Sequence, residues 1–144
     1  MNISELLYAV GSMDSLQKAQ FSKDQCQIGG KKQFIYEIGF NNAGVYGVKK
    51  DKNIGTPSLL SFTEDGDNQV ASFLTELLPN KVGLTGAKVY QQIGAPNCNL
   101  LFEEKTETIL LTGSAETIVI SIPTSALYDG AKNFLVIDFI DFGG

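Results

Sequence analysis

The sequence predicts one α+β domain built on an antiparallel sheet, and two kinds of hydrophobic periodicity support this fold class. Apolar residues recur with helical spacing at about 67–78, whereas they alternate with polar residues, as in strands, around 34–40 and 118–122. The chain has 144 residues, a length at which a single core is stable without disulfides or metal. We therefore expect one domain over residues 1–144, in which helices cover a sheet.

The most clearly patterned segment is the helix expected at about 67–78. Asp67 is placed to cap its start, and Pro79 ends it because proline supplies no amide donor. Asp65, Asp67 and Asn68 also resemble a fragment of a calcium loop, but the other ligand positions are missing, so we expect a cap and no metal site. The apolar stripe of the helix contains Val70, Phe73, Leu74, Leu77 and Leu78.

The segments before this helix change from helical to strand periodicity at Gln33. Residues 3–10 form an expected helix, capped by Asn2 or Ser4, and a second helical piece at 14–21 leads into a loop over 23–32 with one short strand near 26–28. From Gln33 a β-hairpin follows, with a turn at 41–44 and a return strand at 45–49. A minor strand is expected at 59–62.

Four strands are expected after the 67–78 helix, at 87–92, 98–104, 107–112 and 116–122. Short polar turns separate them, among them Lys105-Thr106, which predicts an antiparallel meander.

The segment 133–142 is ambiguous from its local pattern. It is apolar on both faces of a strand, and Val136, Ile137 and Ile140 favour that interpretation because β-branched residues suit strands. A helical stripe is also present in the wider segment, and it contains Tyr128, Ala131, Leu135, Phe139 and Phe142. Periodicity does not decide between the two.

The composition argues for a binding protein without catalysis. The net charge is −5, all eleven basic residues are lysine, and no histidine, arginine or tryptophan occurs. The absence of arginine argues against nucleic-acid binding. The absence of histidine excludes catalytic Ser-His-Asp and Cys-His arrangements. Glu103 and Glu104 point to opposite faces of a strand, and Asp138 with Asp141 is expected to form a solvated acidic face. We expect no catalytic residues, no metal and no cofactor.

Cysteine usage and the N-terminal sequence predict a cytoplasmic protein. Cys26 and Cys98 form no C-x-x-C pair and have no histidine nearby, which favours reduced thiols, with a single bridge between them as the alternative. The first residues lack the features of a signal peptide, and no stretch approaches the roughly 20 apolar residues of a membrane span.

Three segments, in their order along the chain, are similar to profilin, a family of actin-monomer-binding proteins. They are the hairpin F-I-Y-E-I-G-F-N-N-A-G-V-Y-G-V at 34–48, the approach L-T-G-A-K-V-Y at 84–90, and T-I-V-I-S-I-P at 117–123 followed by Y-D-G-A-K-N-F at 128–134. The resemblance implies a profilin-like sheet, with the N-terminal helix and a C-terminal helix over 125–142 on one face and the 67–78 helix on the other.

The resemblance also implies a function and a set of contact residues. The protein is expected to be a monomer that binds monomeric actin, or an actin homologue, and regulates actin polymerisation in the cytoplasm at the cytoskeleton. Lys88 and Lys132 would meet acidic groups of actin, and Asn133 would supply hydrogen bonds. Carried over by position, the actin-binding residues are Lys88, Tyr90, Gly130, Lys132, Asn133 and Asp138.

The chain departs from the profilin pattern at a second surface, the groove between the terminal helices that binds proline-rich peptides. Tyr8, Tyr46 and Phe142 are its remaining aromatic candidates, so we expect weak or absent polyproline binding. Phosphoinositide binding is doubtful because arginine is lacking, although Lys49, Lys50 and Lys52 offer a small basic patch. The composition indicates a divergent profilin of an archaeal type.

Two other functions fit a small acidic α+β domain. One is an adaptor, of the secretion-chaperone or toxin-immunity kind, which neutralises a basic protein partner. The other is a viral structural subunit that assembles through a β-rich surface into large oligomers.

Overall fold

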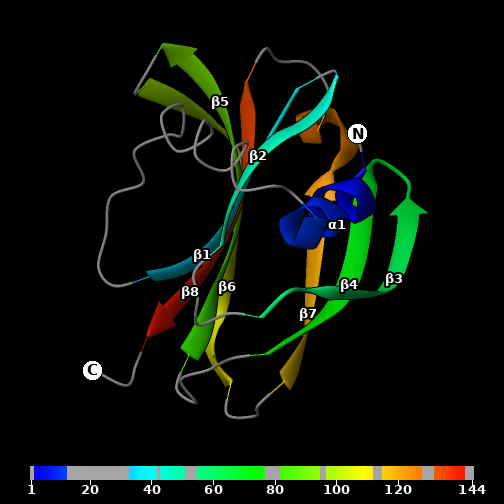
Figure 1. Ribbon diagram of the computed structural model, residues 1–144, viewed down its shortest axis with the longest axis vertical. Helices are drawn as coiled ribbons and strands as arrows, with labels where there is room; N and C mark the ends of the chain where they lie inside the picture. Colours follow the sequence, from blue (N-terminus) through cyan, green and yellow to red (C-terminus); the bar gives the residue numbers. More distant parts are fainter. Residues whose placement is uncertain are drawn as a thin grey trace.

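Two antiparallel sheets, packed against each other, make up most of the molecule (Figure 1). The computed structural model describes residues 2–12, 33–41, 43–50, 55–76, 82–94, 97–111, 115–127 and 132–141. The five-stranded sheet contains, in spatial order, β2 (Gly44–Lys50), β1 (Gln33–Asn41), β8 (Asn133–Asp141), β5 (Val82–Gly94) and β6 (Asn97–Leu111). The three-stranded sheet contains β3 (Ser58–Asp65), β4 (Asn68–Glu76) and β7 (Ala115–Pro123).

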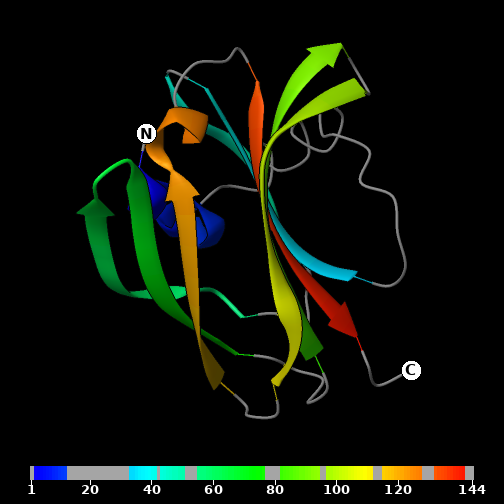
Figure 2. The same cartoon turned by 180° about the vertical axis from the view of Figure 1, so that it is seen from behind.

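The N-terminal helix α1 (Ile3–Ser12) occupies one side of this sandwich, where it contacts β1 and β2 of one sheet and β3 and β4 of the other (Figure 1). The Asn2 side chain caps it, because Oδ1 accepts the amide of Glu5 at 3.0 Å. On the other side β6 lies beside β7, and the short helix η1 (Thr124–Leu127) follows β7 (Figure 2). The predicted helix at 3–10 and its cap at Asn2 are therefore confirmed.

The core lies between the sheets and under α1. Alternating residues of β1 and β5 face residues of β4 and β7, as the period of two requires. The largest fully buried side chains are Tyr36, Phe40, Phe73, Phe134, Ile3, Leu6, Leu7 and Ile38. All of them except Phe134 belong to one continuous core cluster.

Most of the predicted strands are present, with longer bounds. The β1–β2 hairpin turns between the paired residues Asn41 and Gly44, and β3, β5 and β7 cover the strands predicted at 59–62, 87–92 and 116–122. The predicted turn at Lys105-Thr106 is wrong, because β6 continues through it as one strand paired with β5. The fold is α+β in broad terms, with mostly antiparallel sheet and one α-helix in the part described.

The predicted helix at 67–78 is wrong, because its described residues, 67–76, are the end of the turn after β3 and the strand β4. Asp67 is a turn residue and not a helix cap, since Asp65 and Asn68 pair directly across the turn. The buried positions of β4 alternate, and two of them, Gln69 and Thr75, are polar. Apolar periodicity failed here because hydrogen bonds let these two polar residues occupy the core face. The remaining stripe residues Leu77 and Leu78 lie outside the described residues.

The predicted C-terminal helix is also wrong, because Asn133–Asp141 is strand β8 between β1 and β5. Consecutive residues of a strand point to opposite faces, and four in a row are buried here, so both faces of β8 are covered and the strand is apolar on both. Phe134, Leu135, Val136 and Ile137 are all fully buried. The local β-branched signal was correct, and the helix implied by the profilin resemblance was not.

Cys98 is disulfide-bonded, which corrects the expectation of reduced thiols. The chain contains one other cysteine, Cys26, which lies outside the described residues, as do the helix predicted at 14–21 and the loop at 23–32. Disulfides are typical of oxidising compartments. The cytoplasmic location stays a prediction, and this bond argues against it.

Candidate functional site

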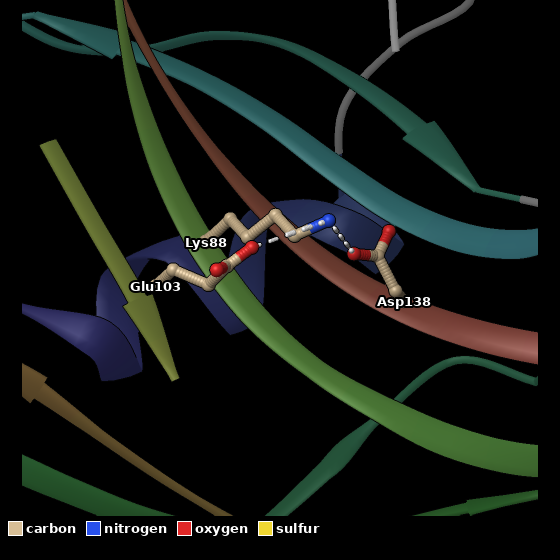
Figure 3. Close-up of polar contacts among 3 residues, drawn as sticks. All are labelled: Lys88, Glu103 and Asp138. Carbon is tan, nitrogen blue, oxygen red and sulfur yellow. Dashed lines mark ion pairs between the residues drawn. The ribbon is translucent and has the colours of Figure 1, made fainter. Parts of the chain in front are cut away.

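The outer face of the five-stranded sheet carries a cluster of charged side chains, which we call the ionic cluster: Lys88, Glu103 and Asp138 (Figure 3). Lys88 Nζ lies 3.2 Å from Asp138 Oδ2 and 3.8 Å from Glu103 Oε2. The three residues come from β5, β6 and β8, so the ion pairs connect three neighbouring strands. Glu103 and Glu104 point to opposite faces as predicted, since Glu104 Oε2 accepts the amide of Ser121 on β7 at 3.4 Å.

Burial dominates the electrostatics of the ionic cluster. Asp138 is 1% exposed, and burial raises its pKa more than the Lys88 charge lowers it. Burial lowers the pKa of Lys88, but the charge and hydrogen bond of Asp138 outweigh it, so this pKa lies above its ordinary value. Burial also raises the pKa of Tyr90, and the negative charges of Asp138 and Glu103 add to that increase.

These pKa directions limit what the ionic cluster can do. A lysine acts as a nucleophile or base when its pKa is lowered, whereas the pKa of Lys88 is raised and its ammonium group is held between two carboxylates. The ion pairs can hold β5, β6 and β8 together, or they can fix the Lys88 ammonium group beside Tyr90 on a binding surface. Its two charges that remain partly exposed are Lys88 and Glu103, at 25% and 26%.

The structure brings four of the six predicted actin-binding residues to two neighbouring strands but buries two of them. Lys88 and Tyr90 on β5 are partly exposed, whereas Asn133 and Asp138 on β8 are each 1% exposed. Lys132 lies just before β8, and its carbonyl accepts the amide of Gln92 at 2.9 Å. The sixth predicted residue, Gly130, is outside the described residues.

The three predicted polyproline-groove residues do not form one site. Tyr46 on β2 packs edge-on against Phe134, with ring centroids 6.2 Å apart, on the same face as Tyr90 and Cys98. Tyr8 lies on α1 and is 77% exposed. Phe142 falls outside the described residues, and the described residues before it, Asn133–Asp141, form strand β8 where the expected groove requires a helix.

Tyr8 instead lines a pocket between α1 and the start of β3, which we call the α1–β3 groove. Its volume is about 470 Å³, within the range of ligand pockets in proteins. Its lining residues are Ser4, Glu5, Leu7, Tyr8, Pro57 and Leu59. Tyr8 and Leu59 expose apolar surface at its rim, and Glu5 contributes a carboxylate.

The α1–β3 groove belongs to a part of the molecule that carries no lysine. We call α1 and the three-stranded sheet, with the turn between β3 and β4, the lysine-free layer. Every one of the eleven lysines lies in other parts of the sequence. The layer contains six acidic residues: Glu5, Glu64, Asp65, Asp67, Glu76 and Glu116. Glu5, Glu64, Asp65 and Asp67 are exposed.

Within the described ranges, no group of three or more histidine, cysteine, aspartate or glutamate side chains gathers to hold a metal ion. Asp65 and Asn68 pair across the β3–β4 turn. No described helix has the length and apolar character needed to span a bilayer.

Comparisons of the chain with protein-family models, with curated proteins and with solved structures find no match.

Sequence reasoning missed the α1–β3 groove and the lysine-free layer. The groove depends on Pro57 and Leu59 meeting α1 in space, which no local pattern reveals. The layer had a visible signal, because no lysine occurs between Lys52 and Lys81 or before Lys18. The ion pair of Lys88 with Asp138 was also missed, since the helix expected over 125–142 placed Asp138 outside the sheet that contains β5.

Proposed function

We propose that the protein is an acidic adaptor, a β-sandwich domain that binds a basic segment of a partner protein on the lysine-free layer. The observation that carries this proposal is the separation of charge, with six carboxylates and no lysine on α1 and the three-stranded sheet. An acidic surface of this kind attracts cationic partners and raises their association rate.

The α1–β3 groove supports the proposal because it supplies an apolar contact beside the acidic residues. Long-range electrostatic attraction raises the association rate and the selectivity of binding, whereas high affinity also requires that apolar surface is removed from water. Tyr8 is 77% exposed and Leu59 42% exposed at this groove. The expected partner segment therefore combines lysine or arginine with leucine-like side chains.

Fluorescence anisotropy with a labelled peptide tests the proposal. The probe is Lys-Lys-Thr-Val-Thr-Leu-Thr-Leu, and the comparison peptide carries glutamate in place of both lysines. We expect the basic peptide to bind and its affinity to fall with salt, because exposed charges are screened. The Glu64→Lys variant is expected to weaken binding by about fivefold to tenfold.

Asn99→Lys is the control, because it also introduces a lysine at an exposed strand position, on β6 of the other sheet. It is expected to alter the affinity by less than about twofold, since it leaves the carboxylates of the lysine-free layer unchanged. Equal effects of the two variants, or equal binding of the basic and acidic peptides, would refute the proposed function.

Actin binding remains a second proposal, supported by the partly exposed pair Lys88 and Tyr90 on one face of β5. This proposal rests on a profilin-like arrangement of elements. The chain has the N-terminal helix and the β1–β2 hairpin of that arrangement, but β4 and β8 are strands where the arrangement requires helices. A pyrene-actin assay tests it: spontaneous polymerisation should slow in the presence of the protein. Unchanged polymerisation with several actins, even at high excess, would reject it.

A further inference from the structure

Among the described strands, none pairs with the outer edge of β3, a strand of the lysine-free layer. β3 is the last strand of its sheet in the part of the chain that the structure describes, paired there with β4, and it lies at the outside of the molecule in both views (Figures 1 and 2). Seven of its eight residues are exposed, including Leu59 at 42% and Leu60 at 56%. An exposed edge with apolar side chains is a template for pairing with another strand.

The edge of β3 is only partly protected against such pairing, because its charges are all negative and so repel only strands that lack cations. It contains no lysine and no proline between Ser58 and Asp65, and Pro57 stands just before it. A bulge between Leu59 and Ser61 interrupts its register with β4. Beyond the bulge, β3 pairs with β4 in unbroken register over Ser61–Asp65, so this part of β3 has the regular strand geometry that an added strand requires.

We infer that the partner segment binds as an extended strand added antiparallel to the outer edge of β3, with its basic residues at its N-terminal end. This inference rests on the proposed function and adds the binding mode and the direction. All strand pairs described in the molecule are antiparallel. In that orientation the N-terminal end of the partner lies opposite Glu64 and Asp65, and its C-terminal end lies near Leu60 and the α1–β3 groove.

A second copy of the chain fits this edge poorly on grounds of charge. Two β3 strands would bring no cation to Glu64 and Asp65, because the strand has none of its own. Each copy also carries a net charge of −5, so approach is repulsive. A basic partner strand supplies the missing cations, in agreement with the monomer predicted from the sequence.

Isothermal titration calorimetry with the full chain and backbone-modified peptides tests the inference. The parent peptide is again Lys-Lys-Thr-Val-Thr-Leu-Thr-Leu, and two derivatives carry N-methyl groups on alternate residues, one in each of the two phases. Only every second amide of an added strand points at its neighbour. We expect one derivative to lose about tenfold or more in affinity and the other to bind like the parent.

A reversed peptide and a pair of protein variants test direction and place. The peptide Leu-Thr-Leu-Thr-Val-Thr-Lys-Lys is expected to bind about fivefold more weakly than the parent, because its lysines lie at the wrong end. Leu60→Lys should weaken binding by about tenfold. Leu100→Lys on β6 of the other sheet, where the leucine is 48% exposed, should change it by less than about twofold.

Several results would overturn the inference. If both methylated peptides bind like the parent, side chains alone hold the partner, and the proposed function stands without strand addition. If the reversed peptide binds more tightly, the antiparallel direction is wrong. A dimer in light scattering that Leu60→Lys dissociates would make a second copy the occupant. If the basic peptide binds no better than its glutamate form, the proposed function fails as well.

Discussion

Asp138 illustrates how one buried carboxylate constrains its neighbours in this protein. It lies on the central strand β8, almost fully buried, with the Lys88 ammonium group 3.2 Å away. Its pKa is raised, so the ionised form at neutral pH lowers the free energy of unfolding, and that cost disappears as the pH falls to the unfolded pKa of about 4. Lys88 offsets part of this cost.

The Lys88→Met substitution should therefore destabilise the protein in a pH-dependent way. Removing the cation leaves Asp138 buried without its ion pair, and we expect a loss of about 2–4 kcal/mol at about pH 7. Protonation of Asp138 should relieve most of this loss at about pH 4.5, because its pKa rises further in the variant. Urea denaturation at both pH values measures the difference.

Lys49→Met is the control for Lys88→Met, because Lys49 is exposed on β2. Its expected effect is below about 0.5 kcal/mol at both pH values. An equal loss from Lys88→Met at about pH 7 and about pH 4.5 would contradict the role given to Asp138.

Tyr36 links the core to the segment that leads into β3. Its hydroxyl group, the Thr75 hydroxyl group and the Gly55 carbonyl lie within hydrogen-bond distance of one another, with Thr75 Oγ1 2.7 Å from the carbonyl oxygen. Each hydroxyl group donates one hydrogen bond, so two of these three contacts are made at a time. Burial raises the pKa of Tyr36, and the Thr75 hydrogen bond offsets a smaller part. This network fixes the backbone just before Pro57, one wall of the α1–β3 groove.

The Tyr36→Phe substitution should lower the free energy of unfolding by about 1–2 kcal/mol, because it removes a buried hydroxyl group and takes one hydrogen-bond partner away from the Gly55 carbonyl and from Thr75. Thr75→Val should cost a similar amount, and the double substitution should cost less than the sum, since both remove the same network. Chemical denaturation of the three variants measures this coupling. Strict additivity would contradict a shared network.

Among the elements, the β3–β4 hairpin shows most clearly where sequence reasoning failed. Val70, Phe73 and Leu74 fit a helical stripe, yet only Phe73 of these faces the core in β4. The core face includes Gln69, whose Oε1 accepts the amide of Ile3 at 2.9 Å, and Thr75, bound to Gly55. Hydrogen bonds to residues far away in the sequence allow these two polar side chains to be buried. A local sequence pattern cannot reveal such distant partners.

The turn of this hairpin gives a direct test of strand against helix. Gly66 has a φ of +60°, a conformation that favours glycine, and no atom lies within 4 Å of a Cβ placed there. Gly66→Ala should therefore cost about 1 kcal/mol, whereas Gly66→Asn should cost less because asparagine tolerates this region. Thermal denaturation compares the two. A neutral or stabilising Gly66→Ala would instead favour a helix beginning at this point.

The strand elements with a clear period of two were predictable, and the central strand was predictable only locally. The β1–β2 hairpin and β7 have alternating apolar residues and recognisable turns. For β8, Val136 and Ile137 signalled a strand, but an apolar pattern on both faces also fits a buried helix. The family resemblance then favoured the helix, because it supplied an order of elements that the chain does not follow.

At the scale of the whole molecule, the charge distribution is the property that connects fold to function. The sandwich separates a lysine-free layer, with its exposed carboxylates, from a five-stranded sheet on which β2, β5 and β6 carry lysines. The lysine-free stretches before Lys18 and between Lys52 and Lys81 are visible in the sequence. Neither the sheet order nor the position of α1 followed from it, so only the structure shows that these stretches form one layer. The sequence did predict an acidic binding protein as one alternative.

Chemical-shift mapping of the ¹⁵N-labelled protein with the basic peptide tests the central claim most directly. We predict that the amide signals that shift belong to β3 (Ser58–Asp65) and to the exposed residues of α1 around Glu5 and Tyr8. Signals of Lys88 and Tyr90 on β5 should stay in place. Shifts confined to the outer face of the five-stranded sheet, or no shifts at saturating peptide, would contradict the account.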